Sequence, residues 1–281
     1  MRRMSRSRNL NKDILRVVLS DMHSGSNYAL FPDRAWHGKH TSHVPRSIQV
    51  TIRKQFETFA EQVKQARKGK AVELIHNGDA IDGDHHHSGD VCTINTVEQA
   101  DIHIELMNEF QKRIKWQAGD KLYYTKGTRV HVTEHEDYIG TELNAVSCGA
   151  FGSWEFLELT TNGILSCFVH HSPQRGGGAN EGNMIRNWLK EICFDAMKDE
   201  RRIPDIIYTG HVHDPTYSSY VYREQMKFLT MHGIICPSWQ AKTSYAHMRM
   251  PLKKNKIGGL FHEIKADGTI TVPIFSIIYT D

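Results

Sequence analysis

Paired cysteines and long apolar runs are both missing from this sequence. Its five cysteines are scattered and none forms a CxxC pair, which excludes a disulfide scaffold and a thiolate zinc site. No stretch approaches the ~20 consecutive apolar residues that span a bilayer. The arginine-rich N-terminus is not followed by an apolar run of signal-peptide length. We therefore expect a protein without a membrane partner, in a reducing, cytoplasmic setting.

A strong excess of charge of either sign is missing as well. The 35 lysines and arginines nearly balance the 32 aspartates and glutamates, and the net charge of +3 gives no global field that would attract nucleic acid. Internal repeats and low-complexity linkers are also absent from the 281 residues, of which 39% are apolar. This composition predicts a single domain over residues 13–281, preceded by a flexible basic arm at residues 1–12.

Short apolar runs alternate with helical patterns along the chain. The predicted strands lie at residues 14–20, 71–76, 121–126, 164–170 and 205–209. The predicted helices lie at residues 51–68, 96–115 and 180–198. Residues 227–280 are strand-like again, with a hairpin signal at Asp267-Gly268. This order predicts a layered α/β sandwich with its polar groups at the carboxyl ends of the strands.

Histidine is what the sequence has in abundance, with 18 residues. Polar clusters follow five of the apolar runs, at Asp21 and His23, Gly78 and Asp79, Gly127 and Thr128, His170 and His171, and His211 and His213. Carboxylates combined with imidazoles suit manganese, iron, zinc or nickel. The alternation at a strand end directs Asp21 and His23 toward one site, and the same holds for His211 and His213. A carboxylate after a glycine, as at Asp79, is able to approach two cations.

These blocks resemble the calcineurin-like metallophosphoesterase superfamily, whose pattern is DxH, GDxxD, GNH, a strand-end histidine and GHxH. The resemblance extends over residues 14–213. It implies a four-layer αββα sandwich with a dinuclear metal site at the strand ends, and a metal-dependent hydrolase that acts on phosphate esters. Two divalent cations are the implied cofactors, with manganese expected and iron, zinc or nickel as alternatives.

The same resemblance implies a set of ligands. Asp21, His23 and His213 correspond to the ligands of one ion, and Asp79 corresponds to the bridging carboxylate, which also makes it a catalytic residue. The second ion is then bound by His211 together with one member of the adjacent pair His170 and His171. The family's HHPP-like form favours His170, whereas its HSP form favours His171. Asp82 stands where some relatives place an additional ligand or a residue that supports one.

The third block departs from the family pattern. Where the family has Gly-Asn-His, this chain reads Gly127-Thr128-Arg129-Val130-His131. Thr128 falls at the position of the asparagine ligand, and we expect its hydroxyl to be a weaker ligand. His131 is the candidate proton donor for the leaving group, with a water or one of His85–His87 as the alternative. Similar blocks occur in phage-type members, which places the protein in the cytoplasm of a bacterium or of a phage-infected cell.

Three further segments have two interpretations each. His85, His86 and His87 form either an additional metal site or a loop of solvated imidazoles. Arg175, in the sequence QRGGG, either helps to hold a phosphate or belongs to a flexible connector. The lysine-rich run at residues 253–256 is either a solvated turn between strands or a contact to nucleic acid.

The substrate is the least determined property. The phage-like third block and the basic N-terminal arm favour a phosphodiesterase or nuclease that acts on DNA or RNA. The first alternative is a small-molecule phosphatase or cyclic-nucleotide phosphodiesterase. The second is an inactive metal-binding scaffold, although a scaffold has no need to keep a complete ligand set. The oligomeric state stays open.

Overall fold

The computed structural model describes residues 12–39, 41–83, 89–129, 134–171, 173, 176–177, 180–224, 226–249 and 254–280. Its helices are α1 (Ser47–Arg67), α2 (Thr96–Arg113), α4 (His135–Glu142), α5 (Asn183–Lys198) and α6 (Ser244–Arg249). Its strands are β1 (Ile14–Leu19), β2 (Trp36–His37), β3 (Ser42–His43), β4 (Ala71–Asn77), β5 (Lys121–Thr125), β6 (Leu157–Thr161), β7 (Ile164–Phe168), β8 (Ile206–Thr209), β9 (Thr216–Glu224), β10 (Lys227–Ile235), β11 (Asn255–Ile264) and β12 (Ile274–Thr280). Within the described ranges, no helix is both long and apolar enough to cross a membrane.

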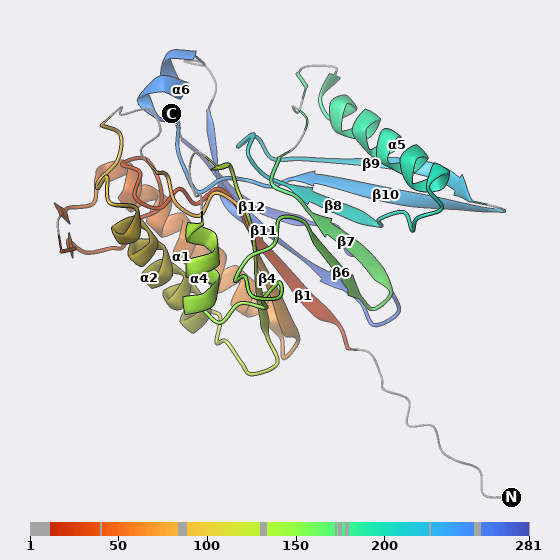
Figure 1. Cartoon of the computed structure of the whole chain (residues 1–281), viewed down its shortest axis with the longest axis horizontal. Helices are drawn as coiled ribbons and strands as arrows, with labels where there is room; N and C mark the ends of the chain where they lie inside the picture. The colour runs from red at the N-terminus through yellow and green to blue at the C-terminus, as the bar shows by residue number, and fades with distance from the viewer. Residues whose placement is uncertain are drawn as a thin grey trace, which may run out of the picture.

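Two five-stranded mixed sheets lie at the centre of the structure (Figure 1). The first has the order β12-β11-β1-β4-β5, in which β1, β4 and β5 are parallel. The second has the order β6-β7-β8-β10-β9, in which β7, β8 and β10 are parallel. Each sheet therefore contains three neighbouring strands whose carboxyl ends meet at one edge, and such edges are where open α/β sheets bind ligands.

The layers follow from the alternation of side chains along the strands. On β1, Val17 and Leu19 pack into the core under the helices, whereas Val18 packs into the core between the sheets. On β7, Phe168 faces the first sheet and Cys167 packs with residues of α5. Helices α1, α2 and α4 thus cover one sheet and α5 covers the other (Figure 1). The predicted four-layer αββα sandwich is confirmed.

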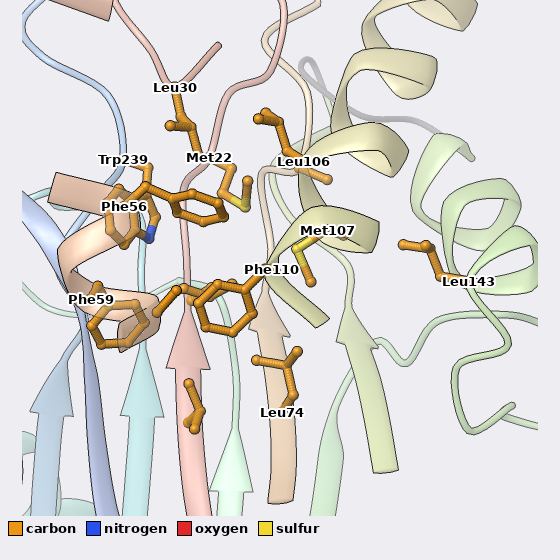
Figure 2. Close-up of a cluster of buried hydrophobic side chains, with 14 of the residues drawn as sticks. Met22, Leu30, Phe56, Phe59, Leu74, Leu106, Met107, Phe110, Leu143 and Trp239 are labelled. Carbon is orange, nitrogen blue, oxygen red and sulfur yellow. The ribbon is translucent and has the colours of Figure 1, made fainter. Parts of the chain in front are cut away.

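The core under α1 and α2 is built around aromatic rings (Figure 2). Trp239 packs against Phe56 and Phe59, with ring centroids 5.2 and 5.7 Å apart, and Phe110 stacks on Phe59. These rings are fully buried. Because the backbone N–H of Trp239 donates to the carbonyl of Asp21 at 3.1 Å, this core is attached directly to a candidate ligand.

Several segments differ from the sequence-based prediction. Helix α1 begins at Ser47, four residues before the predicted start, because the Gln49 side chain accepts the backbone N–H of Arg46 and nucleates the helix early. The predicted turn at residues 253–256 is wrong for its second half, since Asn255 and Lys256 open β11 and pair with β12. Helix α4 was not predicted, and it has too little amphipathic character to stand out in the sequence.

A buried arginine connects the two sheets. Arg16 on β1 has no exposed surface, and its Nε lies 3.1 Å from Glu73 Oε2 on β4. Its Nη2 donates to Thr161 Oγ1 at 3.0 Å, and its Nη1 donates to Ser166 Oγ, both in the second sheet. Burial of charged groups is tolerated when each is paired and hydrogen-bonded, as here.

We expect Arg16→Met to lower the free energy of unfolding by about 3–5 kcal/mol, because Glu73 would lose its counter-charge in a mostly buried site. Adding Glu73→Met should restore most of that loss, since it removes the uncompensated charge. Urea denaturation of the two single variants and the double variant measures both effects. Additive losses in the double variant would contradict this account of the pair.

Candidate metal centre

The predicted polar clusters lie together at the shared edge of the two sheets. The loop after β1 supplies Asp21 and His23, and the loop after β4 supplies Asp79. The chain after β5, β7 and β8 supplies Thr128, His170, His211 and His213. Backbone hydrogen bonds hold the loops in place, among them Asp21 N to Gly78 O at 3.0 Å and Gly210 N to His170 O at 2.8 Å.

One group of candidate ligands consists of Asp21, His23 and His213, whose donor atoms all lie within 4.8 Å of one another. The Nε2 atoms of His23 and His213 are 3.2 Å apart, and His213 Nε2 is 3.1 Å from Asp21 Oδ1. Two donors that share one ion, each about 2.1 Å from it, lie about 3.0–3.4 Å apart. The spacing of these three side chains therefore fits a single cation.

A second group consists of Asp79, His170 and His211, again with all donor atoms within 4.8 Å. His170 Nε2 lies 2.9 Å from Asp79 Oδ2. The same oxygen lies 3.8 Å from Nε2 of His23, which belongs to the first group. Asp79 is thus the carboxylate that lies between the two groups, which is the position of a bridging ligand.

The backbone at these residues has an uncommon conformation. Asp21, His23, Asp79, His211 and His213 all have positive φ, between 43° and 67°. Only a few per cent of residues other than glycine adopt this left-handed region, with asparagine, aspartate and histidine the most frequent among them, and it persists where the surroundings impose it. This backbone conformation recurs at five of the candidate ligands. The packing around this edge of the sheets therefore holds the ligand loops in a conformation that is otherwise uncommon.

Two glycines allow the loops to approach closely. A Cβ added at Gly127 would collide with the backbone N and Oδ1 of Asp79, and one added at Gly78 would collide with the ring of His170. Gly78 also has a positive φ of 83°. The glycines of the second and third sequence blocks are therefore required by contact with the candidate ligands themselves.

Polar contacts on the side of each imidazole away from the site fix the direction of the rings. His23 Nδ1 lies 3.1 Å from Asp82 Oδ1, which also accepts a hydrogen bond from Gln240 Nε2 at 2.9 Å. His170 Nδ1 lies 2.9 Å from the carbonyl of Asn77, and because a carbonyl only accepts, the Nδ1 of His170 is the donor. In both rings Nε2 is left facing the site, an arrangement that is typical of metal-ligating histidine.

Thr128 lies between Asp79 and His211. Its backbone N–H donates to Asp79 Oδ1 at 2.6 Å, and its hydroxyl donates to Asp79 Oδ2 at 3.2 Å. The same hydroxyl is 3.3 Å from His211 Nδ1. The structure therefore places Thr128 beside the second group of candidate ligands.

The adjacent histidines differ in their surroundings. His170 is buried beside Asp79, whereas His171 is exposed and its ring lies against that of His211, with centroids 4.8 Å apart. The structure brings His170, and not His171, into a group of three candidate ligands. Three other predicted elements of the site, namely His85–His87, His131 and Arg175, lie outside the described residues.

The charges at the site are arranged to stabilise one another. Burial alone would raise the pKa of Asp21, but the imidazoles of His213 and His170 outweigh it and hold that pKa below its usual range. Burial alone would lower the pKa of His170, but the carboxylates of Asp21 and Asp79 raise it to about 10. The two buried carboxylates, together with the imidazoles around them, form a set of oxygen and nitrogen donors that is suited to divalent metal ions.

Sequence reasoning missed Glu136, a fully buried residue at the start of α4. Its carboxyl accepts hydrogen bonds from the backbone N–H groups of Gly127, at 2.9 Å, and Ala80, at 3.3 Å. Burial, assisted by the charge of Asp79, raises the pKa of Glu136 to about 8. Glu136 therefore ties the second and third blocks together, a role that no local pattern in the sequence indicates.

Comparison with known proteins identifies no matching family model and no similar protein among those with curated functions. The solved structures that resemble the chain include a Haemophilus influenzae NAD nucleotidase, at 12% identity and a TM-score of 0.44, which covers 95% of this chain and 50% of that one. A Thermus thermophilus sulfate thiohydrolase matches at 10% identity and a TM-score of 0.41, covering 95% and 57%. A 5'-nucleotidase from Candida albicans matches at 13% identity and a TM-score of 0.37, covering 82% and 46%. The chain spans about half the length of these proteins.

We expect Gly127→Ala to reduce metal binding and to lower the free energy of unfolding by about 1–3 kcal/mol, because its Cβ must displace Asp79. Gly119→Ala is the matched control, since a Cβ there meets nothing within 4 Å. Metal analysis and thermal denaturation of both variants measure the difference. A Gly127→Ala protein with full metal content would show that the close approach is not needed.

The two adjacent histidines allow a paired test. Because His170 Nε2 faces Asp79 and His171 is exposed, we expect His170→Ala to lose one bound ion and His171→Ala to retain the normal stoichiometry. Metal analysis after equilibration with manganese measures this. The reverse pattern would assign the ligand to His171.

Proposed function

We propose that the chain is a calcineurin-like metallophosphoesterase of the phage type, which hydrolyses phosphate esters with two divalent cations. Manganese is the expected ion, with iron, zinc or nickel as alternatives. The observation that carries this proposal is the pair of three-residue ligand groups, with Asp79 Oδ2 2.9 Å from His170 and 3.8 Å from His23. One carboxylate within reach of both groups is the arrangement that a dinuclear site requires.

In this proposal one ion is held by Asp21, His23 and His213. The other is held by His170, His211 and Thr128, and Asp79 is shared. Divalent cations in such a site neutralise the charge on a phosphoryl group and acidify water.

The side chains of the chain itself orient this centre and manage protons. Thr128 holds both oxygens of Asp79, and Asp82 fixes the ring of His23. His211 is exposed at the open side of the site, where a substrate enters. His131 remains the proposed proton donor for the leaving group and Arg175 the proposed phosphate contact.

The proposed substrate is a phosphodiester of DNA or RNA. Two features support a diester with an extended anionic chain. The third block has the phage-like form GTRVH, and a cavity of about 220 Å³ next to His211 and His213 is lined by three lysines. Lysines beside a reaction centre attract substrates that carry further phosphates.

Asp79→Asn tests this function directly. A neutral amide does not offset the repulsion between two nearby cations, so we expect turnover of bis(p-nitrophenyl) phosphate to be abolished and bound metal to fall to one ion or none. The exposed Asp101→Asn on α2 is the control and should keep both. Metal analysis and a colorimetric assay measure the two properties.

Retention of two ions and of near-normal rates in Asp79→Asn would refute the dinuclear assignment. A preference of the unaltered protein for p-nitrophenyl phosphate over the diester would instead indicate a small-molecule phosphatase. Metal binding without hydrolysis of either ester would indicate a scaffold.

A further inference from the structure

Two adjoining cavities form a groove that begins at the candidate metal centre. The first, of about 220 Å³, is bordered by His211 and His213. The second, of about 410 Å³, is bordered by Tyr28, Ile48 and His247. The residues that line both cavities are Ala241, Lys242, Thr243 and Asn255. We call this combined surface the C-terminal groove, because most of its wall comes from residues after β10.

Lysine side chains line the part of the groove next to the metal centre. Lys242, Lys254 and Lys256 line the first cavity, and no acidic side chain is among its lining residues. Lys256 forms an ion pair with Asp214, with Nζ 2.6 Å from Oδ1. The backbone N–H of Lys242 donates to Asn255 Oδ1 at 2.7 Å, which fixes the segment that carries Lys242. Lys256 and the backbone of Lys242 are therefore held in the same wall that carries His211 and His213.

The second cavity, which the candidate ligands do not line, includes the side chains of Tyr28 and Ile48 in its wall. Tyr28 and Ile48 are half-buried and pack against the aromatic core. The carbonyl of Tyr28 accepts the backbone N–H of Ala241 at 2.8 Å, and its hydroxyl lies 3.2 Å from Ser244 Oγ. These contacts hold the phenol ring at the groove without any ligand. A preset aromatic face costs little entropy when a planar group stacks on it.

We propose that the C-terminal groove binds the nucleotide adjacent to the scissile phosphate of a single-stranded nucleic acid. The next phosphate then lies among Lys242, Lys254 and Lys256, and the base lies against Tyr28 and Ile48. This proposal rests on the proposed function, and it adds the strandedness of the substrate and the residues that select it. Alternation of phosphate and base along a single strand matches the order of lysines and apolar wall along the groove. A duplex keeps its bases paired and does not present them to such a wall.

The first experiment measures binding apart from turnover. Fluorescence anisotropy follows a labelled oligothymidylate of twelve nucleotides on the purified protein, with hydrolysis stopped by EDTA, over a range of salt concentrations. Lys242→Ala should make the slope of log K against log salt shallower by about 0.7, the value for one lost phosphate contact on a single strand. Lys112→Ala, an exposed lysine on α2, is the matched control and should keep the slope of the unaltered protein.

The second experiment tests the apolar wall. Tyr28→Ala should weaken binding of the oligothymidylate about 5- to 150-fold, the usual range for one stacked base, whereas Tyr28→Phe keeps the ring and most of the affinity. With manganese present, Lys242→Ala should raise KM for the oligonucleotide much more than KM for bis(p-nitrophenyl) phosphate, which has no second phosphate. If Tyr28→Ala does not fold by circular dichroism, the salt slopes of Lys242→Ala and Lys254→Ala decide the proposal.

Equal slopes for Lys242→Ala and Lys112→Ala would overturn the groove proposal. Equal affinity for a duplex of the same length, or equal competition by thymidine monophosphate, would also overturn it. If the unaltered protein does not hydrolyse bis(p-nitrophenyl) phosphate with any of the four metals, the proposed function is wrong, and the anisotropy measurements still decide whether the groove binds single strands.

Discussion

The burial of two carboxylates at the seam between the sheets is the constraint on which the rest of the structure depends. Asp21 and Asp79 have 0% and 1% of their surface exposed. Removing a carboxylate from water costs several kcal/mol unless donors or cations replace the water. The donors nearby come from four different loops, including the backbone N–H of His211 to Asp21 and that of Thr128 to Asp79. The two sheets must therefore end in register at one edge.

This arrangement is held by the core as much as by the site. Left-handed backbone at a residue such as Asp21 costs about 1–3 kcal/mol and persists only where packing imposes it. The carbonyl of Asp21 accepts hydrogen bonds from Trp239 N and Ser238 Oγ, both at 3.1 Å. Trp239 in turn packs against Phe56 and Phe59 (Figure 2). Loosening that aromatic cluster would loosen the ligand loop after β1.

The order of strands and helices was sufficient to predict a layered α/β sandwich, and the four layers were what the family resemblance implied. The cluster of polar residues was predictable because parallel strand ends meet at one edge and side chains alternate along a strand. The sequence was insufficient for groups that support the site from a distance. Gln240 contacts Asp82 across 158 positions, and Glu136 lies on a short helix with a weak pattern. Histidine content was ambiguous too. His103 is buried, bonded to Tyr124 at 2.9 Å, and its pKa is lowered to about 3 by burial, so it serves the core.

The segment between β10 and β11 links the chemistry of the site to the proposed choice of substrate. This segment crosses from the second sheet to the first. Within it, the side chain of Gln240 donates to Asp82, and the residues that follow Gln240 line the C-terminal groove. The groove is positioned by backbone hydrogen bonds, Ala241 N to Tyr28 O and Lys242 N to Asn255 Oδ1. Both bonds are donated by backbone N–H groups, so they hold this segment without using the side chain of Lys242. The metal centre depends on residues at the strand ends, whereas the proposed substrate preference depends on side chains of the C-terminal groove. The two properties are therefore separable in this fold.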